Sequence, residues 1–309
     1  MFAQRTIYRV SSDQLAGNPI DFVAKLMIIF TFCSILFFPG MLVAIVSSNS
    51  YNERRPIHHH RLFSVKDIFS KQADLYARFR PTYPQELFDF ILSLVTKRIN
   101  AWDCATGNGQ VASVLSKFFE HIDATDISEK QIKNATQIKN IAYAIERAEQ
   151  TSFPDNKFDL ITVAQAIHWL EFTGFYREVT RTLKPNGIFA VIGYHTPLVN
   201  SSINPIINRL ESEILHTYWD EETKYVDEFY TTIPFPFTEL QVPKFNAVHH
   251  WTMEQLLGFL SSWSGVQHYI ERNNENPVQF IAGEMKKYWN DRGQKEVTFP
   301  ILLRVGKKA

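Results

Sequence analysis

The sequence predicts an α/β protein with a doubly wound, mostly parallel sheet and helices on both faces. Between about residues 64 and 193, short apolar runs alternate with segments of helical periodicity, which is typical of βαβ units. A glycine-containing turn at 105–109 separates the first strand of the core from a helix, where such folds often bind ligands. The 309 residues, 45% hydrophobic and 21% charged, have the composition of a globular protein with one large domain or two small ones.

Local signals place the elements of this sheet in order. A helix over 84–96 is favoured by Pro84 at its start and by Leu87, Phe88 and Ile91 on one face. Ser128 is the expected N-cap of a helix over 129–139. The other elements are expected as strands at 99–104, 122–125, 142–146, 158–164 and 187–193, and as helices at 64–79, 110–119 and 172–183.

We expect one domain over residues 62–309, with its core at 98–195. The segment 196–295 is rich in proline and aromatic residues, and we interpret it as an insertion on the substrate side. Helices are expected within it at 205–219, 252–261 and 277–289. A closing strand at 297–305 is expected to pair at the sheet edge despite Pro300.

Residues 1–61 form an N-terminal extension of different character. They hold six Lys and Arg against three Asp and Glu, a net +3 that the rest of the chain cancels. Residues 26–46 carry no charge and are long enough to span a bilayer, and the arginines that follow would place the domain on the cytosolic side. In one alternative, Pro39 and Gly40 break such a helix into short apolar pieces that could pack on the domain. In another, the segment is an extension without a structural role. The expected location is therefore cytoplasmic, with possible anchoring through residues 26–46.

Acidic side chains follow neighbouring strands of the predicted core. Asp103 ends the first strand, Asp126 ends the second, where a carboxylate can accept hydrogen bonds from both ribose hydroxyls, and Glu149 follows the third. The turn lacks the spacing of a dinucleotide fingerprint and of a Walker loop, which disfavours phosphate binding and an NAD-dependent dehydrogenase. The residues therefore favour a nucleoside without phosphate. Cys33 and Cys104 form no disulfide or metal-binding pattern, and no metal ion is expected.

Several motifs together resemble those of a known family. They are Asp103-Cys-Ala-Thr-Gly-Asn-Gly-Gln, Ala124-Thr-Asp-Ile-Ser, Ala148-Glu149 with Phe153-Pro-Asp-Asn-Lys-Phe-Asp159, Ala164-Gln-Ala-Ile-His-Trp169, Leu183-Lys-Pro-Asn-Gly187 and the upstream Tyr76-Ala-Arg-Phe-Arg80-Pro-Thr-Tyr83-Pro. The chain is similar to class I S-adenosylmethionine-dependent methyltransferases of the type 11 group, near the trans-aconitate methyltransferase-like branch. The resemblance implies a seven-stranded Rossmann-like sheet, an N-terminal lid and S-adenosyl-L-methionine as cofactor.

The resemblance also implies roles for residues around the cofactor. Asp103 would lie near the methionine amino group, Asp126 would bind the ribose, and Gln165 would lie near the sulfonium. Ala105 stands where many members have glycine, which narrows the turn slightly. The complete set implied to bind the cofactor is Tyr76, Asp103, Ala105, Gly107, Gly109, Asp126, Ile127, Ala148, Glu149 and Gln165.

Residues just past the fourth and fifth strands would line the acceptor site. His168 is the candidate general base, and the alternative is an orienting hydrogen bond or a packed ring. A base is optional, because a carboxylate acceptor is already anionic at neutral pH. The residues expected to contact the acceptor are Arg80, Tyr83, Trp169, Tyr194 and His195.

These observations predict methyl transfer to a small molecule, at oxygen of a carboxylate or hydroxyl. The aromatic residues of 196–295 favour a small acceptor over a protein, and no basic stripe that would track nucleic acid is present. The alternative is a non-catalytic S-adenosylmethionine-binding interaction protein, either tethered to a membrane or free of one.

Overall fold

The computed structural model describes residues 79–289 and 293–309. The described residues all belong to one compact unit, His60–Ala309. Tyr76, most of the expected helix 64–79 and the apolar run 26–46 lie outside the described residues. Among the described helices, none is both long enough and apolar enough to cross a membrane.

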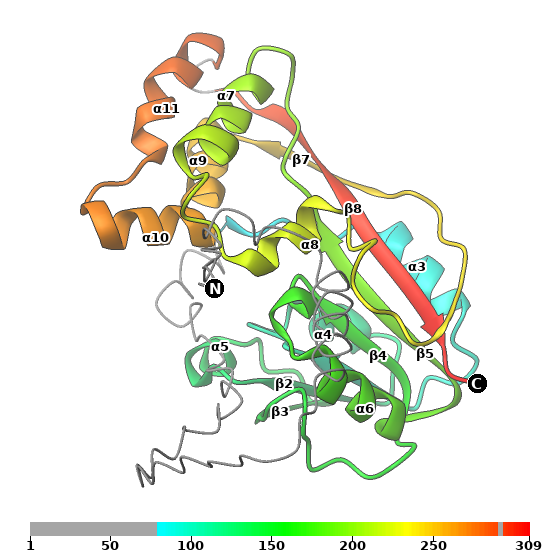
Figure 1. The fold of residues 1–309 in the computed structure, drawn as a ribbon. Coiled ribbons are helices and arrows are strands. Elements are labelled where there is room, and N and C mark those ends of the chain that lie inside the picture. The colour runs from blue at the N-terminus through cyan, green and yellow to red at the C-terminus, as the bar shows by residue number, and fades with distance from the viewer. Residues whose placement is uncertain (1–78, 290–292) are drawn as a thin grey trace, which may run out of the picture. The chain divides into compact units, whose positions relative to one another are not determined.

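An eight-stranded sheet forms the centre of this unit (Figure 1). Its order is β3-β2-β1-β4-β5-β8-β6, and β7 also pairs with β8. The first five strands in this order run parallel, whereas β8 runs antiparallel to β5, β6 and β7. The strands are β1 (Asn100–Cys104), β2 (His121–Asp126), β3 (Ile141–Ile145), β4 (Phe158–Ala164), β5 (Leu183–Tyr194), β6 (Thr238–Glu239), β7 (Asn246–Trp251) and β8 (Lys295–Lys307).

Helices cover both faces of the sheet, because alternate residues of the buried strands point to opposite sides. On one face, Ala101 of β1 packs in a hydrophobic cluster with α3 (Gln85–Ser93) and α4 (Gln110–Leu115). On the other face, Trp102 packs in a second cluster with α6 (Phe172–Thr182). The short helix α5 (Glu129–Lys133) follows β2.

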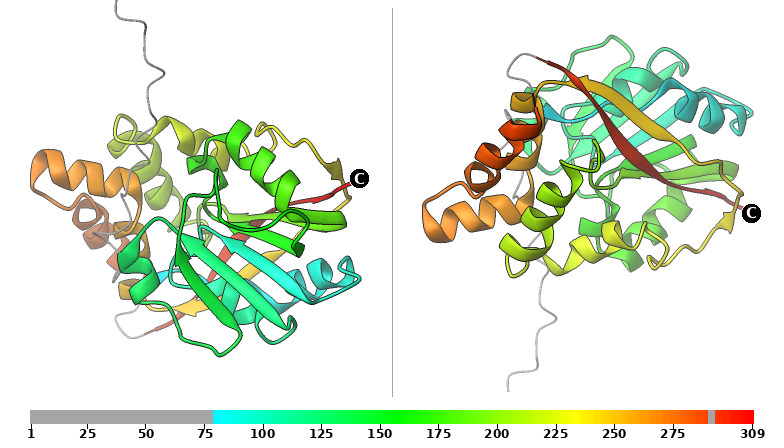
Figure 2. Two further views of the ribbon diagram at one scale, coloured as in Figure 1. Left: turned by 90° about the horizontal axis from the view of Figure 1, so that it is seen from below. Right: turned by 90° about the horizontal axis from the view of Figure 1, so that it is seen from above.

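A third hydrophobic cluster lies in the segment that follows β5. Its helices gather at one end of the sheet, where α10 and α11 are prominent in both views of Figure 2. The α-helices here are α7 (Asn204–Arg209), α8 (Lys224–Asp227), α9 (Met253–Ser261), α10 (Ser264–Asn273) and α11 (Val278–Met285). Shorter turns of 3₁₀-helix occur at Ile167–Trp169, Glu221–Thr223 and Lys286–Tyr288, and Leu210–Ile214 forms a π-helix.

The predicted fold class is confirmed, and two details differ. The sheet has eight strands rather than seven, and two of them, β6 and β7, lie in the proline-rich segment 196–295, where only helices were expected. The closing strand lies inside the sheet, between β5 and β6, and not at its edge. Pro300 lies just beyond the last β5–β8 pair, Tyr194–Ile301, and its carbonyl accepts a hydrogen bond from the backbone N–H of His195.

Several helices end earlier than their sequence pattern predicts. The expected helix 129–139 is the five-residue α5, although Ser128 does cap it by accepting a hydrogen bond from the N–H of Gln131. The expected helix 205–219 is α7 followed by the π-helix, whose wider turn changes the direction of the following side chains.

Candidate active site

The turn after β1 brings backbone and carboxylate together. Ala105, Gly107 and Gly109 all have positive φ, at 52°, 56° and 80°. Asp103 is buried and accepts hydrogen bonds from the hydroxyls of Thr106 and Thr162 and from the N–H of Ala112. Burial raises the pKa of Asp103 to about 6, despite these hydrogen bonds. Asp103 therefore fixes the turn between β1 and α4.

Asp126 at the end of β2 holds the adjacent loops. Its Oδ2 accepts a hydrogen bond from the N–H of Gly107 at 2.8 Å, and its Oδ1 accepts one from the N–H of Ser128 at 2.9 Å. Glu149, after β3, accepts a hydrogen bond from the N–H of Glu171 at 3.3 Å. Asp126 thus connects the carboxyl ends of β1 and β2, and Glu149 connects the loop after β3 with the N-cap of α6, which follows β4.

These loops surround a cavity of about 750 Å³ that opens to solvent, here named the β2–β3 pocket. Its walls are mainly apolar, and among its described lining residues there is no Lys, Arg or His. The lining residues are Ala105, Gly107, Asp126, Ile127, Gln131, Glu146, Ala148, Glu149, Ala164, Gln165, Ala166, Trp169 and Leu170.

A smaller cavity, the turn pocket, lies over the glycine turn. It shares Ala105, Gly107, Ala164 and Gln165 with the β2–β3 pocket, so the two adjoin. The lining residues of the turn pocket that do not line the β2–β3 pocket are Arg80, Tyr83, Asp103, Thr106, Asn108, Gln110, Val111 and Tyr194.

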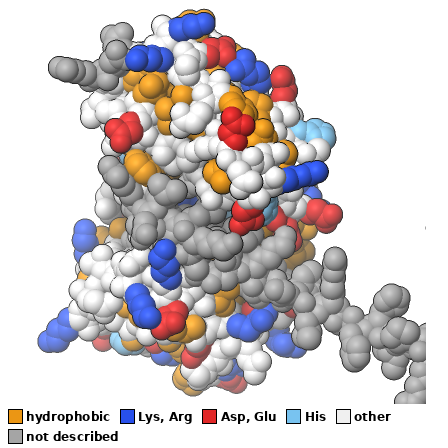
Figure 3. Space-filling view, turned by 90° about the vertical axis from the view of Figure 1, so that its left-hand side faces the viewer, with side chains coloured by type: hydrophobic (Ala, Val, Ile, Leu, Met, Phe, Trp, Pro, Cys, Tyr) orange, Lys and Arg blue, Asp and Glu red, His pale blue; other side chains and the backbone are white. Residues whose placement is uncertain are grey.

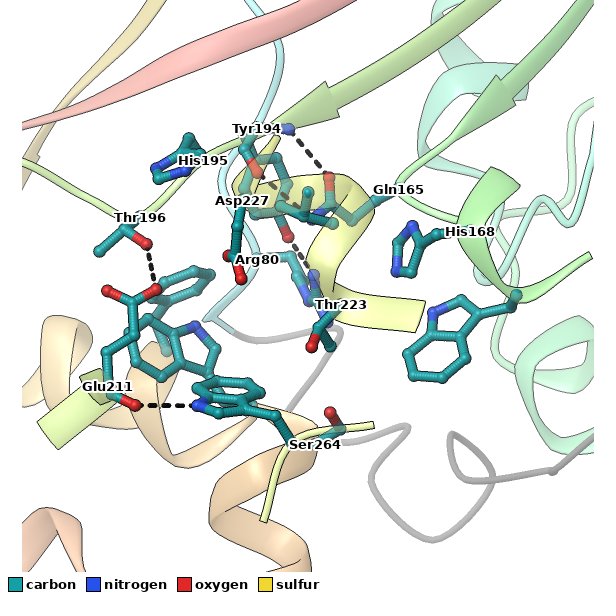
Figure 4. Close-up of a pocket in the computed structure, with 15 residues that line it drawn as sticks. Arg80, Gln165, His168, Tyr194, His195, Thr196, Glu211, Thr223, Asp227 and Ser264 are labelled. Carbon is teal, nitrogen blue, oxygen red and sulfur yellow. Dashed lines mark hydrogen bonds between the residues drawn. The ribbon is translucent and has the colours of Figure 1, made fainter. Parts of the chain in front are cut away.

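A third cavity, of about 760 Å³, opens between β4, β5 and the helices after β5 (Figure 4). We name it the aromatic pocket, because aromatic rings, among them those of Trp169, Trp219, Phe259 and Trp263, line it. Its other lining residues are Arg80, Gln165, His168, Tyr194, His195, Thr196, Glu211, Thr223, Val226, Asp227 and Ser264.

Gln165 lines all three pockets. Its backbone has a positive φ of 51°, a strained conformation for a residue with a side chain. Its Oε1 accepts a hydrogen bond from the N–H of Tyr194 at 2.8 Å, and its Nε2 donates to the Tyr194 carbonyl at 3.3 Å. Figure 4 shows these two bonds. Because its amide is held by the end of β5, Gln165 forms a fixed junction between the pockets.

His168 is buried beside this junction, with 5% of its surface exposed. Its Nδ1 lies 3.0 Å from the hydroxyl of Tyr230, which is fully buried. Burial, and secondarily the charge of Arg80, lowers the pKa of His168 to about 3. His168 is therefore neutral at pH 7 and a weak base. Of the roles expected for His168 from the sequence, its low pKa therefore favours an orienting hydrogen bond over general-base catalysis.

Tyr230 reaches His168 through an unusual backbone. It has a positive φ of 58°, and its carbonyl accepts a hydrogen bond from Nη1 of Arg304 on β8. A side chain at Gly193 would come within 2.6 Å of the Tyr230 ring. Glycine at the end of β5 thus makes the space that this ring occupies.

Most of the residues predicted for the site line one of these pockets. Arg80, Trp169, Tyr194 and His195 line the aromatic pocket, as does His168, whereas Tyr83 lines the turn pocket. Asp103, Ala105, Gly107, Asp126, Ile127, Ala148, Glu149 and Gln165 line the other two pockets. Gly109 instead faces the Tyr143 ring on β3, where a side chain would overlap it.

Sequence reasoning missed the polar residues that the later helices bring to the aromatic pocket. They are Thr196, Glu211, Thr223, Asp227 and Ser264. Thr196 could have been found, because it directly follows two residues that were expected to line the site. The others lie in 196–295, where no periodic pattern indicates which face meets the sheet.

Comparison with known proteins agrees with this geometry. The family described as "Methyltransferase domain" matches residues 102–191. A Dictyostelium discoideum protein named as a methyltransferase is 30% identical over 257 residues, which cover 78% of this chain and 95% of that protein. An uncharacterized methyltransferase of Mycobacterium tuberculosis is 29% identical over 125 residues, covering 40% of this chain and 51% of that protein.

Among solved structures, one from Anaeromyxobacter dehalogenans, titled as a type II methyltransferase, superposes with a TM-score of 0.69. It is 34% identical and covers 74% of this chain and 98% of that chain. The chain belongs to the class I S-adenosylmethionine-dependent methyltransferases. The finer resemblance to the trans-aconitate methyltransferase-like branch stays a prediction.

The residues present fit S-adenosylmethionine. Asp126 stands at the end of β2 with its carboxylate on the β2–β3 pocket, where it can accept ribose hydroxyls. Ile127 and Leu170 offer apolar surface for an adenine. Asp126, Glu146 and Glu149 make the pocket acidic, which suits a sulfonium cation and disfavours a phosphate.

Proposed function

We propose that the protein transfers the methyl group of S-adenosylmethionine to an oxygen, of a carboxylate or hydroxyl, on a small molecule bound in the aromatic pocket. The observation that carries this proposal is the position of Gln165, which lines the aromatic pocket and both pockets assigned to the cofactor. An acceptor atom at this junction would lie next to the end of the cofactor site.

The cofactor supplies an electrophilic methyl group on a positively charged sulfur, so the protein's task is to position the acceptor and exclude water. Arg80 lines both the turn pocket and the aromatic pocket. Its Nη1 donates a hydrogen bond to the Tyr194 hydroxyl, which fixes the guanidinium at the junction. A guanidinium there can hold and orient a carboxylate.

The proton balance favours a carboxylate acceptor. A carboxylate oxygen attacks as an anion, the sulfur–carbon bond breaks as the oxygen–carbon bond forms, and no proton is released. A hydroxyl would have to lose its proton, and the low pKa of His168 makes that residue a poor recipient. Trp169 lies beside His168, with the two ring centroids 4.9 Å apart, and lines both the aromatic pocket and the β2–β3 pocket.

The surface is compatible with a small-molecule acceptor. On the face shown in Figure 3, Lys and Arg side chains are interspersed with Asp and Glu, and no continuous basic stripe is seen among the described residues. A nucleic acid would favour such a stripe.

The test is to incubate the full chain with methyl-labelled S-adenosylmethionine and a fractionated metabolite extract, and to identify labelled products by mass spectrometry. We expect a labelled small molecule that loses its label on mild alkaline hydrolysis, as a methyl ester does. A label stable to alkali would exclude a carboxylate acceptor, and the fragment masses of the product would then show whether the methyl group is on a hydroxyl oxygen. Binding of the cofactor without any labelled product would contradict the proposal and favour a non-catalytic binding protein.

A further inference from the structure

Two tryptophans form a rigid corner at one end of the aromatic pocket. The ring centroids of Trp219 and Trp263 are 5.5 Å apart at an interplanar angle of 53°. Trp219 Nε1 donates a hydrogen bond to the Glu211 carbonyl at 2.9 Å. A side chain at Gly265 would approach the Trp219 ring to 3.0 Å, so glycine allows the ring its position. Neither tryptophan lines the other two pockets, which places the corner away from the cofactor site.

Two carboxylates face the same cavity. Glu211 lies on the π-helix, and its Oε1 accepts a hydrogen bond from the Thr196 hydroxyl at 2.7 Å (Figure 4). Asp227 ends α8 and also lines the cavity. Among residues 79–289 and 293–309, no Lys, Arg or His nitrogen lies within 4.0 Å of either carboxylate. Burial raises the pKa of both groups. For Glu211 the charge of Asp227 adds to this, whereas for Asp227 the charge of the neighbouring His195 opposes it.

This combination suits an organic cation. The faces of tryptophan rings attract an ammonium group through their quadrupole, and two partly buried carboxylates gain stability when a positive charge enters between them. A metal ion fits less well, because the described residues contain no group of three His, Cys, Asp or Glu side chains that could hold one.

We propose that the Glu211–Trp219–Trp263 corner binds an organic ammonium group of the acceptor. With the reacting oxygen toward Gln165, the acceptor class is then a small molecule with an ammonium group at one end and an oxygen nucleophile at the other. The position of the reacting oxygen near Gln165 rests on the proposed function. The ammonium site is inferred from the Glu211–Trp219–Trp263 corner and does not depend on that function.

A charged probe and its neutral isostere test this site directly. Choline and 3,3-dimethyl-1-butanol have nearly the same shape, but only choline is positively charged. We expect calorimetry on the full chain to give at least tenfold tighter binding of choline. Glu211→Gln should weaken choline binding at least fivefold and leave the neutral alcohol unchanged. Glu213→Gln, on the exposed side of the same π-helix, is the matched control and should bind both like the wild type.

Equal affinity for choline and the alcohol, absence of choline binding, or a Glu211→Gln variant with unchanged choline affinity would each overturn the ammonium site. S-adenosylhomocysteine is titrated into every variant in parallel. Normal binding of this ligand shows that the variant is folded. A wild-type chain that does not bind it would contradict the proposed function, whereas normal binding without a preference for choline would contradict only the ammonium site.

Discussion

The buried state of His168 leads to a measurable dependence of stability on pH. Its pKa is about 3 in the folded protein and about 6.5 in an unfolded chain. The unfolded chain therefore binds a proton below about pH 6.5 that the folded protein does not bind. The stability that neutral His168 contributes is fully present above this pH and is lost as the pH falls toward 3.

The perturbation that isolates this effect is His168→Asn, which does not titrate. Proton linkage between the two pKa values predicts that wild type loses about 2 kcal/mol relative to the variant between pH 8 and pH 5. Asp103, with its pKa raised to about 6, has the opposite effect, because it stabilises the folded state as the pH falls below 6. Asp103 is present in both proteins, so its contribution cancels in the difference.

The assay is urea denaturation of both proteins at pH 8, 7, 6 and 5, followed by tryptophan fluorescence. His216→Asn, at an exposed histidine, is the control and should stay within about 0.5 kcal/mol of wild type. A wild-type minus His168→Asn difference that is the same at pH 8 and pH 5 would refute the reasoning. It would mean that His168 accepts a proton in the folded protein, which would restore it as a candidate general base.

Three further substitutions, one of them paired with a comparison variant, test the site. Ala105→Gly should leave the free energy of unfolding unchanged or raise it by up to about 1 kcal/mol, because glycine adopts the positive φ of this position without strain. Ala112→Gly in α4 should instead lower the free energy of unfolding by about 1 kcal/mol. Urea denaturation that ranks the two variants in the reverse order would contradict this expectation. Gly193→Ala should lower stability by about 1–3 kcal/mol and slow methyl transfer, because its methyl group would displace the Tyr230 ring; an unchanged urea midpoint would argue against the contact. Asp126→Asn should weaken S-adenosylhomocysteine binding at least tenfold in calorimetry, and unchanged affinity would remove Asp126 from the cofactor site.

The sheet and the strand-end residues could be predicted from the sequence because local signals determine them. The apolar runs of β1, β2 and β4 are buried on both faces, and each is followed by a turn or cap that the sequence marks. Asp103 and Asp126 stand at the ends of their strands, and parallel pairing brings those ends to one edge. The parallel arrangement of these strands therefore follows from the alternation of strands and helices.

The walls of the aromatic pocket could not be predicted in the same way. Glu211 reaches the cavity through a π-helix, and the positive φ of Phe229 and Tyr230 turns the chain back toward His168. These features depend on contacts with β5 and β8, such as Arg304 to the Tyr230 carbonyl, that lie far away in the sequence. No local propensity favours a π-helix or positive φ at these residues.

The most direct test of the central claim is the structure of the full chain in complex with S-adenosylhomocysteine. We expect the ribose hydroxyls on Asp126, the adenine against Ile127, and the sulfur beside Gln165 at the opening to the aromatic pocket. A ligand whose sulfur lies away from Gln165, or whose adenine occupies the aromatic pocket, would contradict the proposed path of the methyl group.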